Sequence, residues 1–384
     1  MSRVSLNFGK GIALMKNMMT ASGALTAIRF GETAMTLLAK MFQPVAAALL
    51  AMSSQASADP VEDFYRGKRV SLIIGYGTGG GYDTYARLLA RFIGEHIPGN
   101  PAIIAQNMPG AGSRSAANWL YNVAPKDGTV IATLSQTTPT DQALGQSGIQ
   151  FDARKYNWMG NMVVVNNILF VSAKTGVKTL DDAKKNVLAL GATGASSPSV
   201  LYPQVSNNIL GTRFKIVSGY PGGGDINLAV ERGEVDGRGS DSWASMKANK
   251  ANWLRDKSIN ILFQVGPRRE TDLADVPLWS DLAQNDEQRQ ILEVLSGDVA
   301  VGRPILTVPD VPVERVNALR RAFDKTMSDP KFLAAAQQAG MYFNPLGGEE
   351  LQRIVARILS PAPAVIAKVK DAIRTRDVER LPGK

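Results

Sequence analysis

The chain has 384 residues, of which 45% are apolar and 20% are charged, a composition typical of a soluble protein with one large or two medium domains. It contains no cysteine and one histidine, His96, which excludes disulfides, zinc–thiolate sites, iron–sulfur clusters, thiol nucleophiles and multi-histidine metal centres. The formal net charge is +9, without a dense Lys/Arg block interleaved with aromatic residues, so the charge favours small anionic ligands over nucleic acid.

The first 58 residues have the pattern of a secretory signal. Lys40 precedes a short apolar run over residues 45–52, and Ala56 and Ala58 are the small residues that a signal peptidase requires. The run is much shorter than the roughly 20 residues of a membrane span. We therefore predict a signal over residues 1–58 and export to the periplasm; the alternative is a disordered N-terminal extension. This segment holds five of the 43 basic and one of the 34 acidic residues, so the remaining 326 residues have a net charge of +5.

Apolar strands and amphipathic helices alternate along the rest of the chain, which is typical of parallel sheets with crossover helices. No Pro/Ser-rich linker divides the chain, so we expect two α/β lobes joined by extended strands that cross between them more than once. The predicted strands are 70–75, 102–105, 130–134, 162–171 (interrupted at Asn166-Asn167), 187–191, 214–217 and 259–265; the predicted helices are 83–97, 113–123, 180–186, 198–210 and 226–232, with mostly helical structure from residue 281 on.

Four glycine-rich turns each follow an apolar strand and open a helix. They are GYGTGGGYD (residues 75–83), PGAGS (109–113), GATGASS (191–197) and YPGGGD (220–225). Glycines let a ligand approach the backbone closely, and the free N–H groups of a helix N-terminus suit a carboxylate or phosphate. Because ligands of open α/β sheets bind at the carboxyl ends of the strands, we expect these turns to surround a ligand. Several such turns together could hold a carboxylate without an arginine.

Alternative roles exist for the polar residues of these turns. Asp83, Ser113, Ser197 and Asp225 could simply cap helices, and we favour that role for Asp83 and Asp225. The aromatic residues beside the turns could cover a ligand or pack in the core; they are Tyr76, Tyr82, Tyr220 and Trp243.

Three other features of the sequence give little support for a cofactor, a catalytic histidine or a metal site. Gly75, Gly77 and Gly80 match G-x-G-x-x-G, but the next strand ends at Gln106-Asn107, without the acidic residue that a dinucleotide fold requires. His96 suits the end of a helix, and the acidic residues near residues 231–236 suit a solvated helix end rather than a metal site.

Several segments, in this order, resemble the solute-binding proteins of tripartite tricarboxylate transporters, the Bug or TctC-like family. The matching stretches are residues 70–88, 107–112 (NMPGAG), 124–129 (APKDGT), 220–223 (YPGG), 233–236 (GEVD), 259–269 and 275–277 (DVP). The resemblance covers most of residues 65–360.

The resemblance implies an α/β, two-lobed periplasmic-binding-protein-like fold of type II, in which each lobe is a mixed sheet flanked by helices and the ligand cleft lies between the lobes. Residues 59–165 and 263–384 would form the first lobe and residues 166–262 the second. Carried over turn by turn, the ligand-binding residues would be Tyr76, Gly77, Thr78, Gly79, Gly80, Gly81, Asp83, Ser135, Gln136, Thr137, Thr193, Ala195, Ser196, Ser197, Tyr220, Gly222 and Asp225.

The function that follows is the capture of a small organic carboxylate, a di- or tricarboxylate or an aromatic acid, for delivery to a membrane permease. We expect a monomer with no metal, no cofactor, no nucleic-acid partner and no catalytic activity. Two alternatives remain open at this point. One is a secreted hydrolase or lyase with a pair of carboxylates, and the other is a sensory receptor that presents a bound metabolite to a membrane kinase.

Overall fold

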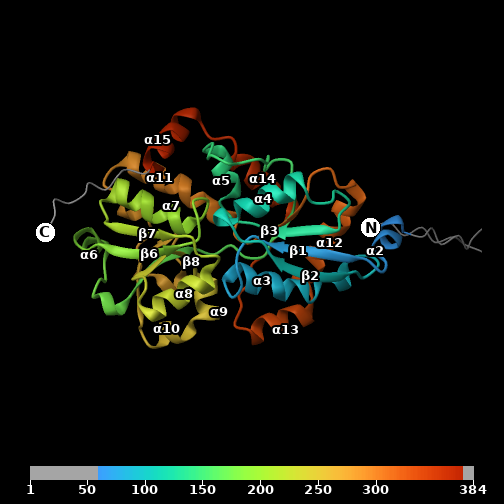
Figure 1. Ribbon diagram of the computed structural model, residues 1–384, viewed down its shortest axis with the longest axis horizontal. Helices are drawn as coiled ribbons and strands as arrows, with labels where there is room; N and C mark the ends of the chain where they lie inside the picture. Colours follow the sequence, from blue (N-terminus) through green and yellow to red (C-terminus); the bar gives the residue numbers. More distant parts are fainter. Residues whose placement is uncertain (1–58, 375–384) are drawn as a thin grey trace, which may run out of the picture. The chain divides into compact units, whose positions relative to one another are not determined.

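Two mixed β-sheets organise residues 59–374, the part of the chain that the computed structural model describes (Figure 1). The predicted signal over residues 1–58 lies outside the described residues. The six-stranded sheet has the order β11-β4-β10-β3-β1-β2 and the five-stranded sheet the order β7-β6-β8-β5-β9. The strands are β1 Arg69–Ile74, β2 Ala102–Asn107, β3 Val130–Thr133, β4 Asn157–Asn161, β5 Asn167–Ser172, β6 Leu188–Ala192, β7 Phe214–Ser218, β8 Gly237–Ser242, β9 Ile259–Val265, β10 Pro304–Thr307 and β11 Leu346–Gly347.

Helices cover both faces of each sheet. In Figure 1, α4 and α3 lie on opposite sides of the six-stranded sheet, and α7 and α8 lie on opposite sides of the five-stranded sheet. The helices are α2 Pro60–Tyr65, α3 Gly81–Ala90, α4 Arg114–Asn122, α5 Thr138–Ala143, α6 Leu180–Lys185, α7 Pro198–Val205, α8 Gly223–Arg232, α9 Trp243–Asn249, α10 Ala251–Arg255, α11 Asp286–Ser296, α12 Val313–Ser328, α13 Pro330–Gln338, α14 Gly348–Ile358 and α15 Pro363–Ile373. Over residues 59–374, no helix combines the length and the apolar character that crossing a bilayer requires.

Each sheet contains a parallel trio of strands, β2-β1-β3 in the first sheet and β7-β6-β8 in the second. The remaining strands pair in antiparallel fashion, β4 with β10 and β11 in the first sheet and β5 with β8 and β9 in the second. The chain passes from the first sheet to the second between β4 and β5, and returns between β9 and β10. The two-lobed α/β fold predicted from the sequence, with more than one crossing, is therefore confirmed.

Side chains of the central strands alternate between two cores. In β1, Leu72 and Ile74 join one buried cluster while Ile73 joins another, and in β5 the pairs Ile168/Phe170 and Leu169/Val171 divide in the same way. Successive residues of a strand point to opposite faces, so these runs are apolar throughout because both faces are covered.

The lobe boundaries remain a prediction. β9 belongs to the second sheet over its whole length, to Val265. Helices α11 and α15 also pack in the core of the second sheet, through Leu292, Leu295 and Val369 among others. The end of β9, from residue 263 on, and both helices fall within residues 263–384, which the sequence predicts to be part of the first lobe.

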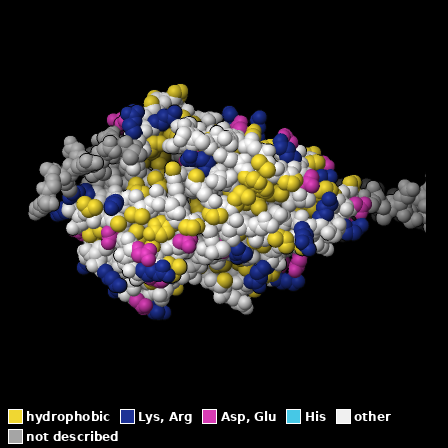
Figure 2. All heavy atoms as spheres, in the orientation of Figure 1, with side chains coloured by type: hydrophobic (Ala, Val, Ile, Leu, Met, Phe, Trp, Pro, Cys, Tyr) yellow, Lys and Arg dark blue, Asp and Glu magenta, His cyan; other side chains and the backbone are white. Residues whose placement is uncertain are grey.

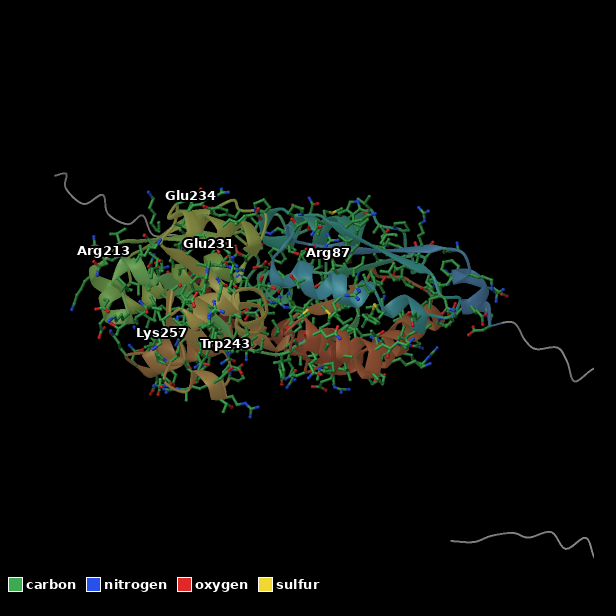
Figure 3. All side chains as sticks on the ribbon, turned by 90° about the horizontal axis from the view of Figure 1, so that it is seen from below. Arg87, Arg213, Glu231, Glu234, Trp243 and Lys257 are labelled. Carbon is green, nitrogen blue, oxygen red and sulfur yellow. The ribbon has the colours of Figure 1, made fainter. Side chains whose placement is uncertain are left out.

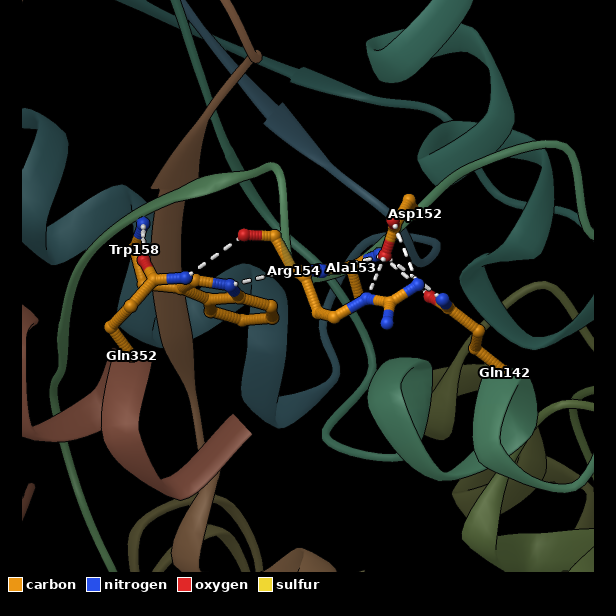
Figure 4. Close-up of polar contacts among 6 residues, drawn as sticks. All are labelled: Gln142, Asp152, Ala153, Arg154, Trp158 and Gln352. Carbon is orange, nitrogen blue, oxygen red and sulfur yellow. Dashed lines mark hydrogen bonds and ion pairs between the residues drawn. The ribbon is translucent and has the colours of Figure 1, made fainter. Parts of the chain in front are cut away.

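A set of polar contacts ties the segment after α5 to β4 and α14 (Figure 4). Asp152 accepts hydrogen bonds from Gln142 Nε2 at 2.9 Å and from Arg154 Nε at 3.0 Å. Gln352, on α14, donates to the carbonyl oxygen of Arg154 and accepts from the backbone N–H of Trp158. Burial raises the pKa of Asp152, but the hydrogen bonds from Arg154 and Gln142 outweigh it and lower the pKa to about 2.

Asp152→Asn tests this contribution to stability. A carboxyl whose pKa is lowered by folding stabilises the protein above its unfolded value of about 4, and that stability is lost as the pH falls through the folded pKa of about 2. In urea titrations, the variant should be less stable than the parent by a constant amount above about pH 5, and the difference should shrink towards pH 2. A difference that stays constant down to pH 2 would contradict this role.

Candidate functional site

The carboxyl ends of both parallel trios meet around one cavity. The residues from the first sheet and its loops are Tyr76, Gly80, Gly81, Tyr82, Gln136 and Arg303; those from the second are Asn167, Thr193, Ser197, Pro198, Ser199, Gly223, Arg238, Ser240, Asp241 and Ser242. The lining combines two guanidinium groups, one carboxylate, several hydroxyls, and glycines at the starts of α3 and α8. Such a lining suits a small anion.

The first and fourth glycine turns touch each other across the cavity. The N–H of Gly77 donates to the carbonyl oxygen of Pro221 at 2.8 Å. A methyl group added to Gly224 would come within 2.8 Å of the carbonyl oxygen of Thr78, and one added to Gly80 would lie 3.0 Å from the nitrogen of Gly223. Glycine is needed here because two backbones meet.

The second and third turns are in contact in the same way. A methyl group on Gly194 would lie 2.6 Å from the nitrogen of Gly112. Beside this contact, Thr137 Oγ1 donates to the carbonyl oxygen of Ser196 at 2.5 Å, and the Arg114 guanidinium donates to the Ser196 hydroxyl. The four turns therefore hold the two sheets together in a closed arrangement around the cavity.

Arg303 is a buried cation in this cavity. It precedes β10 and is 5% exposed. Its guanidinium donates to the hydroxyl of Ser245 and lies over the rings of Tyr82 and Tyr85, at 4.7 and 4.9 Å from the ring centroids. Among residues 59–374, Arg303 forms no ion pair with a carboxylate, and its Nε has no hydrogen-bond partner. Arg303 thus has no salt-bridge partner among the described residues, although its charge helps to lower the pKa of the neighbouring Asp241 carboxyl.

Arg238, the second cavity arginine, is paired. It lies on β8 and contacts Asp241 at 2.7 Å, while Asp241 also accepts from the N–H of Ser242 at 2.9 Å. Burial lowers the pKa of Arg238 and raises that of Asp241, whereas each charge of the pair counteracts the shift in its partner. The 2.7 Å contact makes Asp241 the salt-bridge partner of Arg238, and the charge of Arg303 also helps to lower the pKa of Asp241.

Two tyrosines form one wall. The Tyr76 and Tyr82 rings stack at 4.5 Å. The Tyr82 hydroxyl accepts from the N–H of Gln136 at 3.0 Å and donates to the carbonyl oxygen of Gly302. Burial raises the pKa of both hydroxyls, so both remain neutral and the wall presents ring surface and hydroxyl groups.

A polar network beneath the cavity joins the two sheets. Asp298, in the segment that returns to the first sheet, accepts from Gln136 Nε2 and from the Tyr202 hydroxyl, each at 3.0 Å. Asn167, at the start of β5, donates to the same Tyr202 hydroxyl. Burial raises the pKa of Asp298 to about 7, although both hydrogen bonds oppose the shift.

The structure places the residues predicted as ligand-binding in three groups. Tyr76, Gly80, Gly81, Gln136, Thr193 and Ser197 line the cavity. Gly77, Thr78, Thr137, Ser196 and Gly222 lie in contacts between the turns. Gly79, Asp83, Ser135, Ala195, Tyr220 and Asp225 belong to the same loops but do not line the cavity.

Asp83 braces the first turn. Its carboxylate accepts from the N–H of Gly79 at 3.0 Å, from Arg87 Nε at 2.8 Å and from Asn107 Nδ2 at 2.8 Å. Arg87 lies on α3 (Figure 3). These contacts fix the shape of the turn, in which Gly80 and Gly81 line the cavity and Asp83 does not.

Other residues singled out in the sequence lie away from the cavity. Trp243 donates to Asp272 at 2.8 Å, and Glu231, labelled in Figure 3, pairs with Lys250 at 2.5 Å. Basic and acidic side chains are interspersed on the face shown in Figure 2. Within residues 59–374, no cluster of acidic or histidine side chains could hold a metal ion.

Sequence reasoning missed the charged part of the site. Arg238, Ser240, Asp241 and Ser242 lie on β8, whose sequence, GRGSDS, lacks a strand pattern, and Arg303 precedes a four-residue strand. The alternation of strands and helices along the chain could have indicated β8, since the helix predicted over residues 226–232 should be followed by a strand.

Gly194→Ala tests the closed arrangement. Overpacking of this kind costs roughly 1–3 kcal/mol, so the lobes should separate. In small-angle X-ray scattering, the variant should show a larger radius of gyration, with an unchanged circular dichroism spectrum. Gly297→Ala is the matched control, because a methyl group there would meet nothing within 4 Å. An unchanged radius in Gly194→Ala would show that this contact does not hold the lobes together.

Comparison with known proteins identifies the fold. No model of a protein family matches the sequence, and no curated protein matches it. Among solved structures, the periplasmic binding protein BugD is similar, with a TM-score of 0.66 and 19% identity over 80% of this chain and 98% of that chain. MatC from Rhodopseudomonas palustris, with bound malate, has a TM-score of 0.61 and 18% identity over 80% and 99% of the two chains.

A second R. palustris protein, solved with adipate, has a TM-score of 0.61 and 20% identity over 80% of this chain and 97% of that chain. At sequence identities of this size, structural similarity shows the fold alone. The chain therefore has the fold of the periplasmic binding protein BugD and of these two R. palustris proteins, as the sequence motifs had predicted.

Proposed function

We propose that this chain is an extracytoplasmic solute-binding protein of the Bug/TctC type, which captures a small organic carboxylate between its lobes. The observation that carries the proposal is Arg303, a buried guanidinium that faces the cavity and forms no salt bridge among residues 59–374. A buried charge is costly unless it is paired. A ligand carboxylate would supply the missing partner.

The remaining lining would orient that carboxylate. Gly80 and Gly81 begin α3 and Gly223 begins α8, so the free N–H groups of two helix N-termini border the cavity. Such termini favour an anion by about 0.3–1 kcal/mol each. Hydroxyls of Ser197 and Ser240 add further donors and acceptors.

Closure would couple binding to a change of conformation. The ligand would contact residues of both sheets, so it would favour the closed arrangement in which the glycine turns touch. Closing would also exclude water, which strengthens the interaction between Arg303 and the carboxylate.

The comparisons support this reading, since two proteins of similar fold were solved with malate and adipate. We further propose that the chain acts as a monomer in the periplasm and delivers its ligand to the permease of a tripartite tricarboxylate transporter. Residues 59–165 with part of the C-terminal region would move as one lobe against the lobe built on the second sheet.

The residues that line the cavity favour a solute-binding protein over the alternative of a hydrolase. A mechanism with two carboxylates needs both to face the substrate. Of the described residues that line the cavity, Asp241 carries the one carboxyl group, and it is paired with Arg238.

Arg303→Gln tests the proposal. Loss of one partner of a buried charge pair costs about 2–5 kcal/mol, so affinity should fall by roughly 30-fold or more. The ligand for calorimetry would be the organic acid that gives the largest thermal shift in a screen of small carboxylates. Arg255→Gln, on an exposed arginine of α10, should leave the affinity unchanged. Unchanged affinity in Arg303→Gln would refute the role of Arg303.

A further inference from the structure

Two side-chain amides line the cavity, one from each sheet. Gln136 follows β3 of the first sheet, and Asn167 begins β5 of the second; both residues are buried. Each amide has an NH₂ group, which only donates hydrogen bonds, and an oxygen, which only accepts them. The end of each amide that faces the cavity therefore decides what a ligand must offer at that place.

Contacts beneath the cavity use the NH₂ groups of both amides. Nε2 of Gln136 donates to Asp298 Oδ1 at 3.0 Å and to the Tyr202 hydroxyl oxygen at 3.4 Å. The Tyr202 hydroxyl gives its one hydrogen to the same Oδ1, so its oxygen accepts from Nδ2 of Asn167 at 3.1 Å. Asp298 Oδ2 has no hydrogen-bond partner. A proton on this carboxyl would therefore lie on Oδ2, and Oδ1 would remain an acceptor.

The two amide oxygens are left to face the cavity. Within residues 59–374, neither Oε1 of Gln136 nor Oδ1 of Asn167 accepts a hydrogen bond, since the contacts of both side chains run through their nitrogens. Neither oxygen is enclosed by protein, because the enclosed side-chain atoms without a partner belong to other residues. Both residues line the cavity, so it presents two acceptors whose orientation is fixed from behind.

The other polar groups of the lining place no such demand on a ligand. Serine and threonine hydroxyls can donate or accept, whichever the ligand requires. The carboxylate of Asp241 already accepts from Arg238 and from the N–H of Ser242. A ligand carboxylate, which also only accepts, cannot pair with the oxygens of Gln136 and Asn167. A buried acceptor without a partner is costly, so these two oxygens call for a donor.

We infer that the ligand is a carboxylate that also carries a hydrogen-bond donor, a hydroxyl or an ammonium group, and that Gln136 and Asn167 accept from this group. The class includes the hydroxy and amino derivatives of both mono- and dicarboxylates. Asp298 is a positioning residue, which acts by holding the Gln136 amide in place. The inference rests on the proposed function and narrows its ligand class. Because the two oxygens come from different sheets, a donor that reaches both also favours the closed arrangement.

The experiment compares acids that share a carbon chain and differ in one substituent. The probes are succinate, malate, aspartate and methylsuccinate, and glutarate, 2-hydroxyglutarate, glutamate and 2-methylglutarate, titrated by calorimetry at about pH 7, where the carboxylates are ionised. If the best acid of the carboxylate screen has another chain, the same four substituents on that chain form a third series. In at least one series, the hydroxyl or the ammonium member should bind roughly tenfold or more tightly than the unsubstituted and methyl members.

Variants beneath and in the cavity should reduce this preference. Gln136→Met keeps the length of the side chain but removes the oxygen, so the ratio of the donor-bearing to the unsubstituted member should fall roughly tenfold. Asp298→Leu releases the Gln136 amide and should lower the same ratio. Asp298→Asn keeps an acceptor oxygen and should restore it, which a merely structural role of Asp298 would not predict. Gln337→Met, at an exposed position of α13, is the matched control and should leave the ratio unchanged.

The outcomes separate this inference from the proposed function. A parent that binds the unsubstituted or methyl member as tightly as the donor-bearing members in every series overturns the inference and leaves carboxylate binding standing. A preference that persists undiminished in both Gln136→Met and Asp298→Leu also overturns it. Thermal unfolding checks that each variant folds, and the parent's series decide the question where a variant does not. A parent that binds no small carboxylate at all overturns the proposed function itself.

Discussion

The properties of the site depend mainly on one buried charge, that of Arg303. The guanidinium of Arg303 is removed from water, is faced by two tyrosine rings and one serine hydroxyl, and forms no salt bridge among the described residues. Cation–π contacts recover part of the lost hydration, but a buried ion without a partner remains costly. In the proposed function, an arriving anion would relieve this electrostatic penalty, which would give binding both its strength and its preference for negative charge.

The glycine turns explain how this charge can be enclosed. Gly77 lies against Pro221, and Gly112 against Gly194, with separations that leave no room for a side chain. Backbone contacts of this kind are short and rigid, so the sheets approach closely only in one arrangement. Around them, the contacts of Asp83 within the first turn and of Asp298 beneath the cavity fix the shape of the surfaces that meet. In the proposed function, recognition and closure would thus depend on the same few loops.

Much of the fold could be predicted from the sequence, whereas the charged half of the site could not. Strands β1 and β9 are apolar runs whose burial on both faces makes them easy to recognise, and the glycine turns follow strands as expected. Strand β8 lies in the middle of its sheet, but its polar side chains line the cavity, so its sequence resembles that of a polar loop. Arg303 lies near Arg238 only because the chain returns to the first sheet before β10. No local sequence pattern indicates a contact between residues so far apart in the chain.

The most direct test of this account is the NMR signal of the arginine Nε–H groups in ¹⁵N-labelled protein, assigned with Arg303→Gln and Arg238→Gln and followed while the preferred carboxylate is added. The account predicts that the Arg303 Nε–H resonance moves strongly downfield in proton shift as it gains an anionic acceptor, with a smaller change at Arg238, whose charge is already paired with Asp241 through Nη1. A saturating ligand that leaves the Arg303 resonance in place would contradict it.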